Sequence, residues 1–213
     1  MNAGVNSLRV GGAGIPRVVK IGYAVWLLVY FPVYLESYGW ENFLWFCNAS
    51  NLLIGLAIFI ESTLLLSAVA TAVLLPQLMW IIDFGGRILL GFHPIGGTEY
   101  MLDPQYPLLA RILSCYHVVM PVLIIWLLKR QGYDRRGPLL QTAIAWMILP
   151  LSYWLADPAE NVNWLWRPFN VEQTLLPPLG YLIFALVAYP LVLYLPTHLA
   201  LSRWLPCPRQ QSA

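Results

Sequence analysis

The sequence predicts an all-α integral membrane protein, a single domain of six transmembrane helices with both termini in the cytoplasm. Three observations predict this fold. Of the 213 residues, 59% are apolar and only 10% are charged, whereas a soluble domain carries about 25% charged residues. The apolar residues gather in six runs that can each cross a bilayer. The basic residues gather in the segments that would lie on one side of that bilayer.

The six apolar runs comprise residues 18–35, 43–60, 63–82, 108–128, 138–155 and 179–200. A helix rises about 1.5 Å per residue and the hydrocarbon core is about 30 Å thick, so runs of roughly 20 residues can span it. Because lipid offers no hydrogen bonds to the backbone, helix is the form expected for such continuous runs. No small-residue cleavage pattern follows the first run, so we expect it to be a retained span.

The distribution of charge orients the predicted bundle. Cytoplasmic segments of membrane proteins carry an excess of Lys and Arg. With the N-terminus inside, nine of the twelve basic residues fall on the cytoplasmic side, and the loop of residues 129–136 (KRQGYDRR) contributes most to this bias. Most acidic residues fall outside, together with two long connections, residues 83–107 and 156–178. We expect these connections to cap the bundle or to dip back into it.

Composition also limits the partners. The net charge of +2 does not indicate a nucleic-acid partner, and the apolar composition implies a lipid bilayer. The three cysteines lack CxxC spacing, which argues against a disulfide framework and a zinc site. His93 and His198 lie at other depths than His117, so we predict no metal site and no cofactor. The sequence does not determine the oligomeric state.

Polar residues lie at similar depth in several of the predicted helices. Asn51 lies about 12 Å and His117 about 13 Å below the outer ends of their runs, counted at 1.5 Å per residue. Polar side chains at membrane depth are costly and usually face the bundle interior, where they mark a site or a path. We therefore predict an outer-side pocket for a lipid or small molecule, with these binding residues: Asn48, Asn51, Arg111, Ser114, Tyr153 and Asn163.

Cys47 and His117 are the candidate catalytic residues of this pocket. A thiolate is a strong nucleophile, and a histidine can accept its proton. Asn51 would orient the histidine or donate a hydrogen bond to a developing oxyanion. At this depth the accessible substrate would be a lipid acyl ester, so one hypothesis is a lipid acyl hydrolase or acyltransferase.

A second hypothesis is a non-catalytic binding, carrier or assembly protein. The asparagines would then join helices by hydrogen bonds, Cys47 and Cys115 would fill small apolar spaces, and His117 would be structural. Asp83 and Arg87, four residues apart, are interpreted as an interfacial ion pair at the end of the third helix.

The order of these features resembles a group of small multi-span membrane proteins. The group includes the androgen-induced hydrolases of branched fatty-acid esters, a related transmembrane phospholipid acyltransferase and bacterial integral-membrane relatives. The resemblance covers about residues 40–170 and rests on WFCNASNLL (45–53), SCYHVVMPVLIIWLL (114–128), the basic loop and DPAENVNW (157–164).

The resemblance implies a nucleophilic Thr or Cys in an early helix and a histidine in a later one, here His117. Two registers are open. Matching the family asparagine to Asn51 places Asn48 at the nucleophile position, whereas matching the cysteine of the acyltransferase branch places Cys47 there. The chain also resembles a family of bacterial integral-membrane proteins of unassigned function, which implies a bacterial inner membrane.

Overall fold

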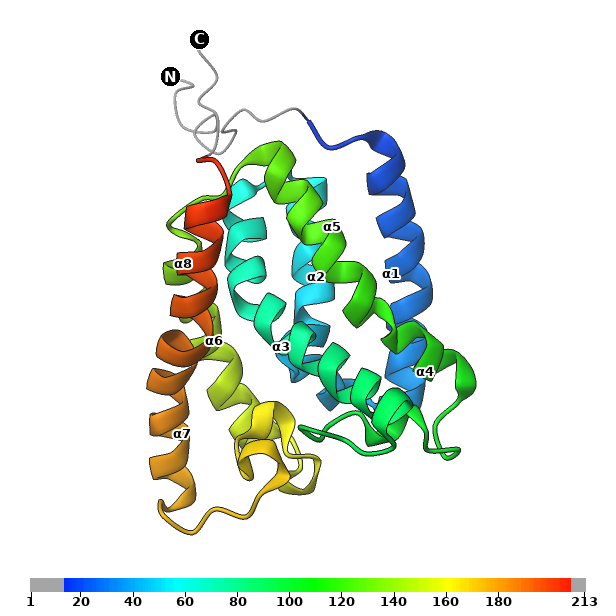
Figure 1. Ribbon diagram of the computed structural model, residues 1–213, viewed down its shortest axis with the longest axis vertical. Helices are drawn as coiled ribbons and strands as arrows, with labels where there is room; N and C mark the ends of the chain where they lie inside the picture. Colours follow the sequence, from blue (N-terminus) through cyan, green and yellow to red (C-terminus); the bar gives the residue numbers. More distant parts are fainter. Residues whose placement is uncertain (1–13, 208–213) are drawn as a thin grey trace.

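The computed structural model describes residues 14–207, and every regular element in this range is helical (Figure 1). Five stretches are long and apolar enough to cross a membrane. They are α1 (Arg17–Tyr38), α3 (Thr63–Leu90), α4 with α5 (Leu108–Ser114 and Tyr116–Gln131), α6 (Gly137–Leu155), and α7 with α8 (Pro178–Ala188 and Leu195–Trp204), the last two joined by a π-helical segment, Tyr189–Tyr194. These helices confirm the predicted class, a helical multi-pass membrane protein.

The predicted second span, residues 43–60, is divided. A short 3₁₀ helix, Trp40–Leu44, is followed by Trp45 in an extended conformation and then by α2 (Phe46–Phe59). With 14 residues, α2 rises only about 21 Å, less than a full hydrocarbon core. The structure therefore has five long apolar helices and one shorter one in this range.

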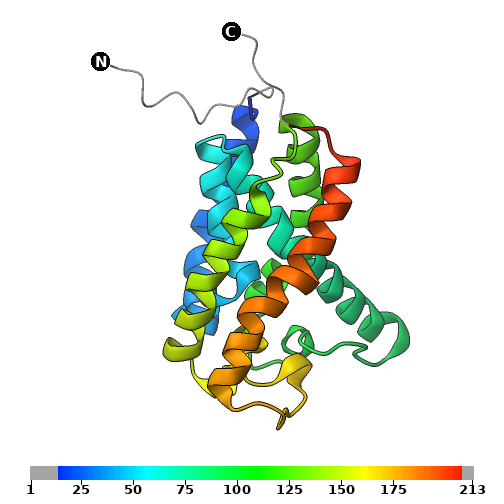
Figure 2. The ribbon, with the colours of Figure 1, turned by 90° about the vertical axis from the view of Figure 1, so that its left-hand side faces the viewer.

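The predicted third span is also different, because α3 continues eight residues beyond position 82, to Leu90. The helix ends at Gly91, whose φ of 83° is left-handed and suits a glycine C-cap. Residues 83–90 thus extend the helix past Asp83, which the sequence placed in the outer connection. Figure 1 shows α3 crossing the bundle obliquely, and Figure 2 shows its C-terminal end projecting from the side of the bundle.

Small residues let α3 occupy a central position. It packs against α2, α5 and α6, and Ser67, Ala68 and Ala70 are fully buried at these contacts. Gly137, at the start of α6, lies so close that a Cβ atom there would be 2.8 Å from the Ser67 carbonyl carbon. Small residues at helix crossings allow close backbone approach in membrane bundles.

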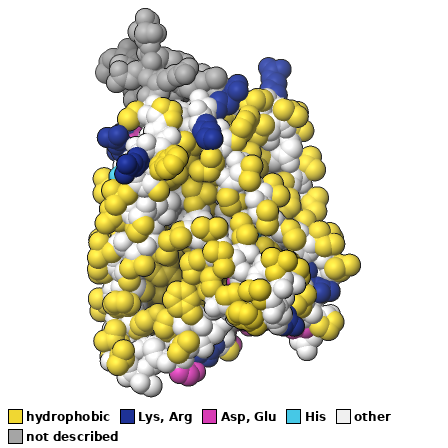
Figure 3. Space-filling view, viewed as in Figure 1, with side chains coloured by type: hydrophobic (Ala, Val, Ile, Leu, Met, Phe, Trp, Pro, Cys, Tyr) yellow, Lys and Arg dark blue, Asp and Glu magenta, His cyan; other side chains and the backbone are white. Residues whose placement is uncertain are grey.

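The outer surface of the bundle is apolar. Leu28 on α1, Val122 on α5 and Leu139 on α6 are each at least 68% exposed, and Figure 3 shows hydrophobic side chains covering the sides of the molecule. Contiguous apolar surface of this extent is rare on a soluble monomer. It fits a protein whose sides contact lipid.

The basic loop and both ends of the described chain lie at one end of the bundle. The Tyr133 amide donates to the Pro206 carbonyl oxygen (2.8 Å), and Arg130 Nε donates to the Gly14 carbonyl oxygen (3.2 Å). Figure 3 shows Lys and Arg side chains gathered at this end. The two long connections lie at the opposite end, next to the N-terminus of α2 (Figure 1).

Candidate functional site

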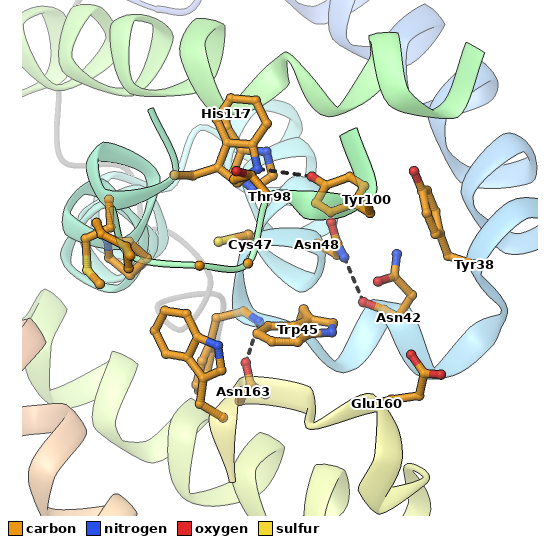
Figure 4. Close-up of a pocket in the computed structure, with 18 of the residues that line it drawn as sticks. Tyr38, Asn42, Trp45, Cys47, Asn48, Thr98, Tyr100, His117, Glu160 and Asn163 are labelled. Carbon is orange, nitrogen blue, oxygen red and sulfur yellow. Dashed lines mark hydrogen bonds between the residues drawn. The ribbon is translucent and has the colours of Figure 1, made fainter. Parts of the chain in front are cut away.

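A cavity of about 310 Å³ lies at the end of the bundle opposite the basic loop (Figure 4). Its walls come from α1, α2, α3, α5 and the π-helical segment, and from both long connections. Four of the predicted site residues line it: Cys47, Asn48, His117 and Asn163. The other four, Asn51, Arg111, Ser114 and Tyr153, do not.

Asn48 is a hydrogen-bonding centre between three elements. Its Oδ1 accepts hydrogen bonds from the Tyr30 hydroxyl (2.8 Å) on α1 and the Tyr116 hydroxyl (2.7 Å) on α5. Its Nδ2 donates to the Asn42 carbonyl oxygen (2.8 Å). Asn48 is 7% exposed, so its amide group is occupied by protein contacts. It cannot act as the nucleophile that one register of the resemblance implies, because an amide has no nucleophilic hydroxyl or thiol.

Tyr30 belongs to a group of α1 tyrosines that were not among the predicted site residues. Tyr23, Tyr30 and Tyr34 are all buried, and their spacing of seven and four residues places them on one helix face. Tyrosines at this spacing indicate a polar helix face, which goes unnoticed when only amides, cysteines and histidines are considered. The Tyr23 and Tyr30 hydroxyls donate to Asn51 and Asn48 on α2, and the Tyr34 hydroxyl hydrogen-bonds with Ser114 at the end of α4.

Asn51 takes part in the contact between α1 and α2 and does not line the cavity. Its Nδ2 donates to the Cys47 carbonyl oxygen (3.1 Å), and its Oδ1 accepts from Trp26 Nε1 (3.1 Å). The side chain is fully buried and does not contact His117 by any hydrogen bond in the described chain. The predicted role of Asn51 in orienting His117 is therefore wrong for this arrangement.

His117 lies in the cavity wall with one ring nitrogen occupied. Its Nδ1 lies 2.8 Å from the Ser114 carbonyl oxygen, and because a carbonyl only accepts, Nδ1 carries the proton. The ring stacks between Trp80 (4.7 Å between centroids) and Tyr116 (4.1 Å). This leaves Nε2 as the nitrogen that could bind or accept a proton.

Cys47 and His117 share the cavity but are not coupled. No hydrogen bond joins them within residues 14–207, and Figure 4 shows the Cys47 sulfur below the His117 ring, at the centre of the group of side chains. A catalytic pair normally lies within hydrogen-bond reach. The cavity thus contains the two predicted reactive side chains without the contact that activates a thiol.

The remaining three predicted residues contact groups outside the cavity lining or support it from behind. Ser114 is fully buried, where it hydrogen-bonds with the Tyr34 hydroxyl. Arg111 donates from Nη1 to the Met101 carbonyl oxygen (3.3 Å). Tyr153 stacks on Trp166 with ring centroids 4.7 Å apart. These three residues lie at the membrane depth predicted for the pocket, but their side chains do not line the cavity.

Asn163 joins the second long connection to the start of α2. Its Oδ1 accepts from the Phe46 amide (3.0 Å) and its Nδ2 donates to the Leu44 carbonyl oxygen (2.8 Å). The first amides of a helix have no intrahelical partner, so Asn163 satisfies one of them from outside the helix. Its φ of 53° is left-handed, which asparagine tolerates better than most residues.

Asp83 fixes the first long connection against the cavity. The carboxylate is 1% exposed, and its Oδ1 accepts from the Ile95 and Gly96 amides at 2.8 Å each. Its Oδ2 accepts from the Thr98 hydroxyl and lies 3.1 Å from His93 Nδ1. Residues 95–98 form one wall of the cavity, so Asp83 positions that wall.

The interpretation of Asp83 and Arg87 as an ion pair is wrong. Arg87 donates to the Gly91 carbonyl oxygen, and the ionic partner of Asp83 among the described residues is His93. The reason is that α3 does not end at Asp83. The helix continues, and the connection folds back so that its amide groups reach the carboxylate.

Tyr100 adds a polar group to the aromatic wall. Its hydroxyl accepts from Trp80 Nε1 (3.0 Å). Burial raises the pKa of the Tyr100 phenol above its usual range, because a buried phenolate would lose its hydration. The side chain therefore remains a neutral hydrogen-bonding group.

The comparisons with known proteins leave the site to be interpreted from its own geometry. No protein-family model, no curated protein and no solved structure matches this chain.

Proposed function

We propose that this chain is a multi-pass protein of a bacterial inner membrane that binds a small amphipathic molecule in the cavity at the non-cytoplasmic end. The observation that carries this proposal is the cavity itself, about 310 Å³, with Cys47, Asn48 and His117 in a wall to which nine Phe, Tyr and Trp side chains contribute. Ligand pockets have volumes of about 300–1,000 Å³, are mostly apolar and contain few polar groups.

The hydrogen bonds of the cavity favour binding over chemistry. The side-chain oxygen of Asn48 and the amide group of Asn163 are engaged in contacts that hold helices and connections together. His117 keeps one nitrogen available, and Cys47 has no basic partner among the described residues. Such a wall is preorganised to surround a ligand, and preorganisation lowers the entropic cost of binding.

Binding can be tested with 1-aminoanthracene, a small neutral aromatic amine whose fluorescence rises in apolar sites. We expect saturable binding to the purified protein in maltoside micelles. Cys47→Phe would fill the cavity and remove the saturable component. Cys115→Phe is the matched control, because Cys115 is exposed outside the cavity. Equal probe binding by both variants and the original protein would refute a ligand site in this cavity.

A second candidate function is acyl transfer, because Cys47 and His117 line the same cavity. In that reaction His117 Nε2 would accept the thiol proton while the sulfur attacks an ester carbonyl carbon. The alcohol would leave with that proton, and water or an acceptor alcohol would then release the acyl group from the thioester. This requires the two side chains to approach by local motion.

Adduct mapping separates the two candidates. With an acyl-type electrophile, we expect Cys47 to react at a rate that His117→Ala leaves unchanged, because no hydrogen bond couples the two residues. The measurement is mass spectrometry of the modified peptide over time, with Cys115 as the internal reference thiol. A Cys47 rate that falls at least tenfold in His117→Ala would favour acyl transfer.

The proposed orientation places the basic end in the cytoplasm, with α2 and the 3₁₀ helix before it as a sixth crossing. Cys207 lies at the basic end and is exposed. In a variant with Cys47→Ala and Cys115→Ala, a membrane-impermeant maleimide should label Cys207 only after the cells are permeabilised. Glu172→Cys, with Cys207→Ala added, should be labelled in intact cells. The opposite pattern would reverse the orientation.

A further inference from the structure

We propose that the ligand of this cavity carries an organic cation, a quaternary or fully alkylated ammonium group. The inference rests on the proposed binding function and names its ligand class. Two independent features of the described cavity point to it: the number of aromatic rings in the wall and the sign of the charge at its edge.

Nine Phe, Tyr and Trp side chains contribute to the wall. Six of them, besides the stack of Trp80 on His117, come from five separate segments: Tyr38, Trp45, Tyr100, Tyr106, Trp164 and Tyr189. The face of an aromatic ring is electrostatically negative. Rings that converge on one space attract a cation through their faces, and the attraction grows when the site excludes water.

The charge of the lining has one sign. Of the Asp, Glu, Lys and Arg residues in the described chain, Glu160 alone lines the cavity. It is exposed and forms no salt bridge among the described residues. Arg167, the basic side chain on the same connection, donates to the Ala159 carbonyl oxygen instead. An anionic ligand would find no positive partner in this wall.

The polar groups of the wall limit the kind of cation. A primary ammonium has three N–H donors that must be satisfied when it is desolvated. Asn48 Oδ1 already accepts two hydrogen bonds, so it has no capacity left for a third donor. A metal ion is also disfavoured, because residues 14–207 contain no cluster of three or more His, Cys, Asp or Glu. Acceptors remain at His117 Nε2 and at the Tyr38 hydroxyl, which has no hydrogen-bond partner among the described residues. A cation without N–H donors needs neither of them and can be held by the aromatic rings alone.

The test compares choline with 3,3-dimethylbutan-1-ol, its neutral isostere. Binding is followed by intrinsic tryptophan fluorescence, because three tryptophans line the cavity, in maltoside micelles that contain no ammonium lipid. We expect choline to bind roughly tenfold more tightly than the isostere, the effect of a desolvated cation–π site. Ethanolamine, a primary ammonium of similar length, should bind more weakly than choline.

Glu160→Gln should weaken choline binding about threefold and leave the isostere unchanged, since an exposed carboxylate is partly screened by salt. Glu36→Gln is the matched control. Glu36 is an exposed carboxylate of α1 that does not line the cavity, so this variant should bind choline as the original protein does.

An ammonium group can arrive as a free small molecule or as a phospholipid headgroup. Dihexanoylphosphatidylcholine below its micellar concentration distinguishes these sources from choline, and dihexanoylphosphatidylglycerol is its control without the cation. Tight binding of choline alone supports the free cation. Preference for the phosphatidylcholine over both choline and the phosphatidylglycerol supports the headgroup.

The inference is overturned if neither choline nor the phosphatidylcholine binds more tightly than its uncharged or anionic counterpart. If 1-aminoanthracene still binds in the manner that Cys47→Phe abolishes, the cavity remains a ligand site for a neutral molecule. If 1-aminoanthracene, choline and the lipids all fail to bind, the proposed binding function fails as well.

Discussion

Replacing Asn48 with leucine should lower the free energy of unfolding by about 3 kcal/mol, because it leaves two tyrosine hydroxyls without an acceptor in a buried, apolar setting. The Tyr30 and Tyr116 hydroxyls both donate to Asn48 Oδ1, at 2.8 and 2.7 Å, and Tyr30 is fully buried. Leucine has the same branching as asparagine, with two methyl groups in place of the amide oxygen and nitrogen, so it leaves no void and carries no polar atom. The loss is therefore dominated by unpaired donors and not by a void.

Equilibrium unfolding in mixed micelles measures this effect, and a rescue variant isolates its cause. Tyr30→Phe and Tyr116→Phe, added to Asn48→Leu, remove the two unpaired hydroxyls. We expect the triple variant to recover more than half of the loss, since replacing both partners by apolar groups is far less costly than orphaning one. A triple variant less stable than Asn48→Leu alone would contradict the hydrogen-bond explanation.

The local chemistry of the chain was sufficient to predict most of the helices. The runs at 18–35 and 138–155 correspond to α1 and α6 within about three residues at each end, because apolar length in lipid leaves helix as the favoured form. The helices whose bounds differ from the prediction are determined by contacts between residues far apart in the sequence. The α2 segment is interrupted at Trp45 because Asn163, more than a hundred residues away, caps Phe46.

For the candidate site, the sequence predicted how deep each residue lies along its helix, but not which way its side chain faces. Counting residues along a helix gives the distance from its end, so Cys47, Asn48 and His117 were placed at one level. Which side chains face one another depends on how the helices rotate and cross. Asn51, only one turn from Cys47, faces Trp26 on α1 instead of the cavity.

The wall of the cavity was the least predictable part. It depends on residues 95–106 and 160–164, which belong to connections without a regular hydrophobic period. The amides of Ile95 and Gly96 and the distant carboxylate of Asp83 do not specify each other in sequence. Their contact exists only because α3 extends past Asp83 and its connection folds back over it.

Asp83→Ala should release this connection and remove the cavity wall. The substitution eliminates the acceptor of the Ile95 and Gly96 amides and of the Thr98 hydroxyl. Hydrogen bonds to a charged group contribute about 1.5–3 kcal/mol each. Because the connection can open to solvent and recover part of this energy, we expect global stability to fall by roughly 2–3 kcal/mol. Binding of 1-aminoanthracene should be lost.

Hydrogen exchange of the Ile95 and Gly96 amides reports the change directly. We expect both amides to exchange at least tenfold faster in Asp83→Ala, which corresponds to about 1.4 kcal/mol of lost protection. Asp83→Asn keeps one oxygen for the two amides and is expected to have an intermediate effect. Protection that is unchanged in Asp83→Ala would mean that other contacts hold the connection.

Arg87→Ala is the control that separates this arrangement from a surface ion pair. If Asp83 acted only as the partner of Arg87, the two alanine variants would have equal and small effects, as exposed ion pairs contribute about 0–1 kcal/mol. Since Arg87 contacts the Gly91 carbonyl oxygen instead, its removal should leave the Ile95 and Gly96 amides protected. The large effect should belong to Asp83 alone, because its carboxylate is the acceptor around which residues 95–98 fold.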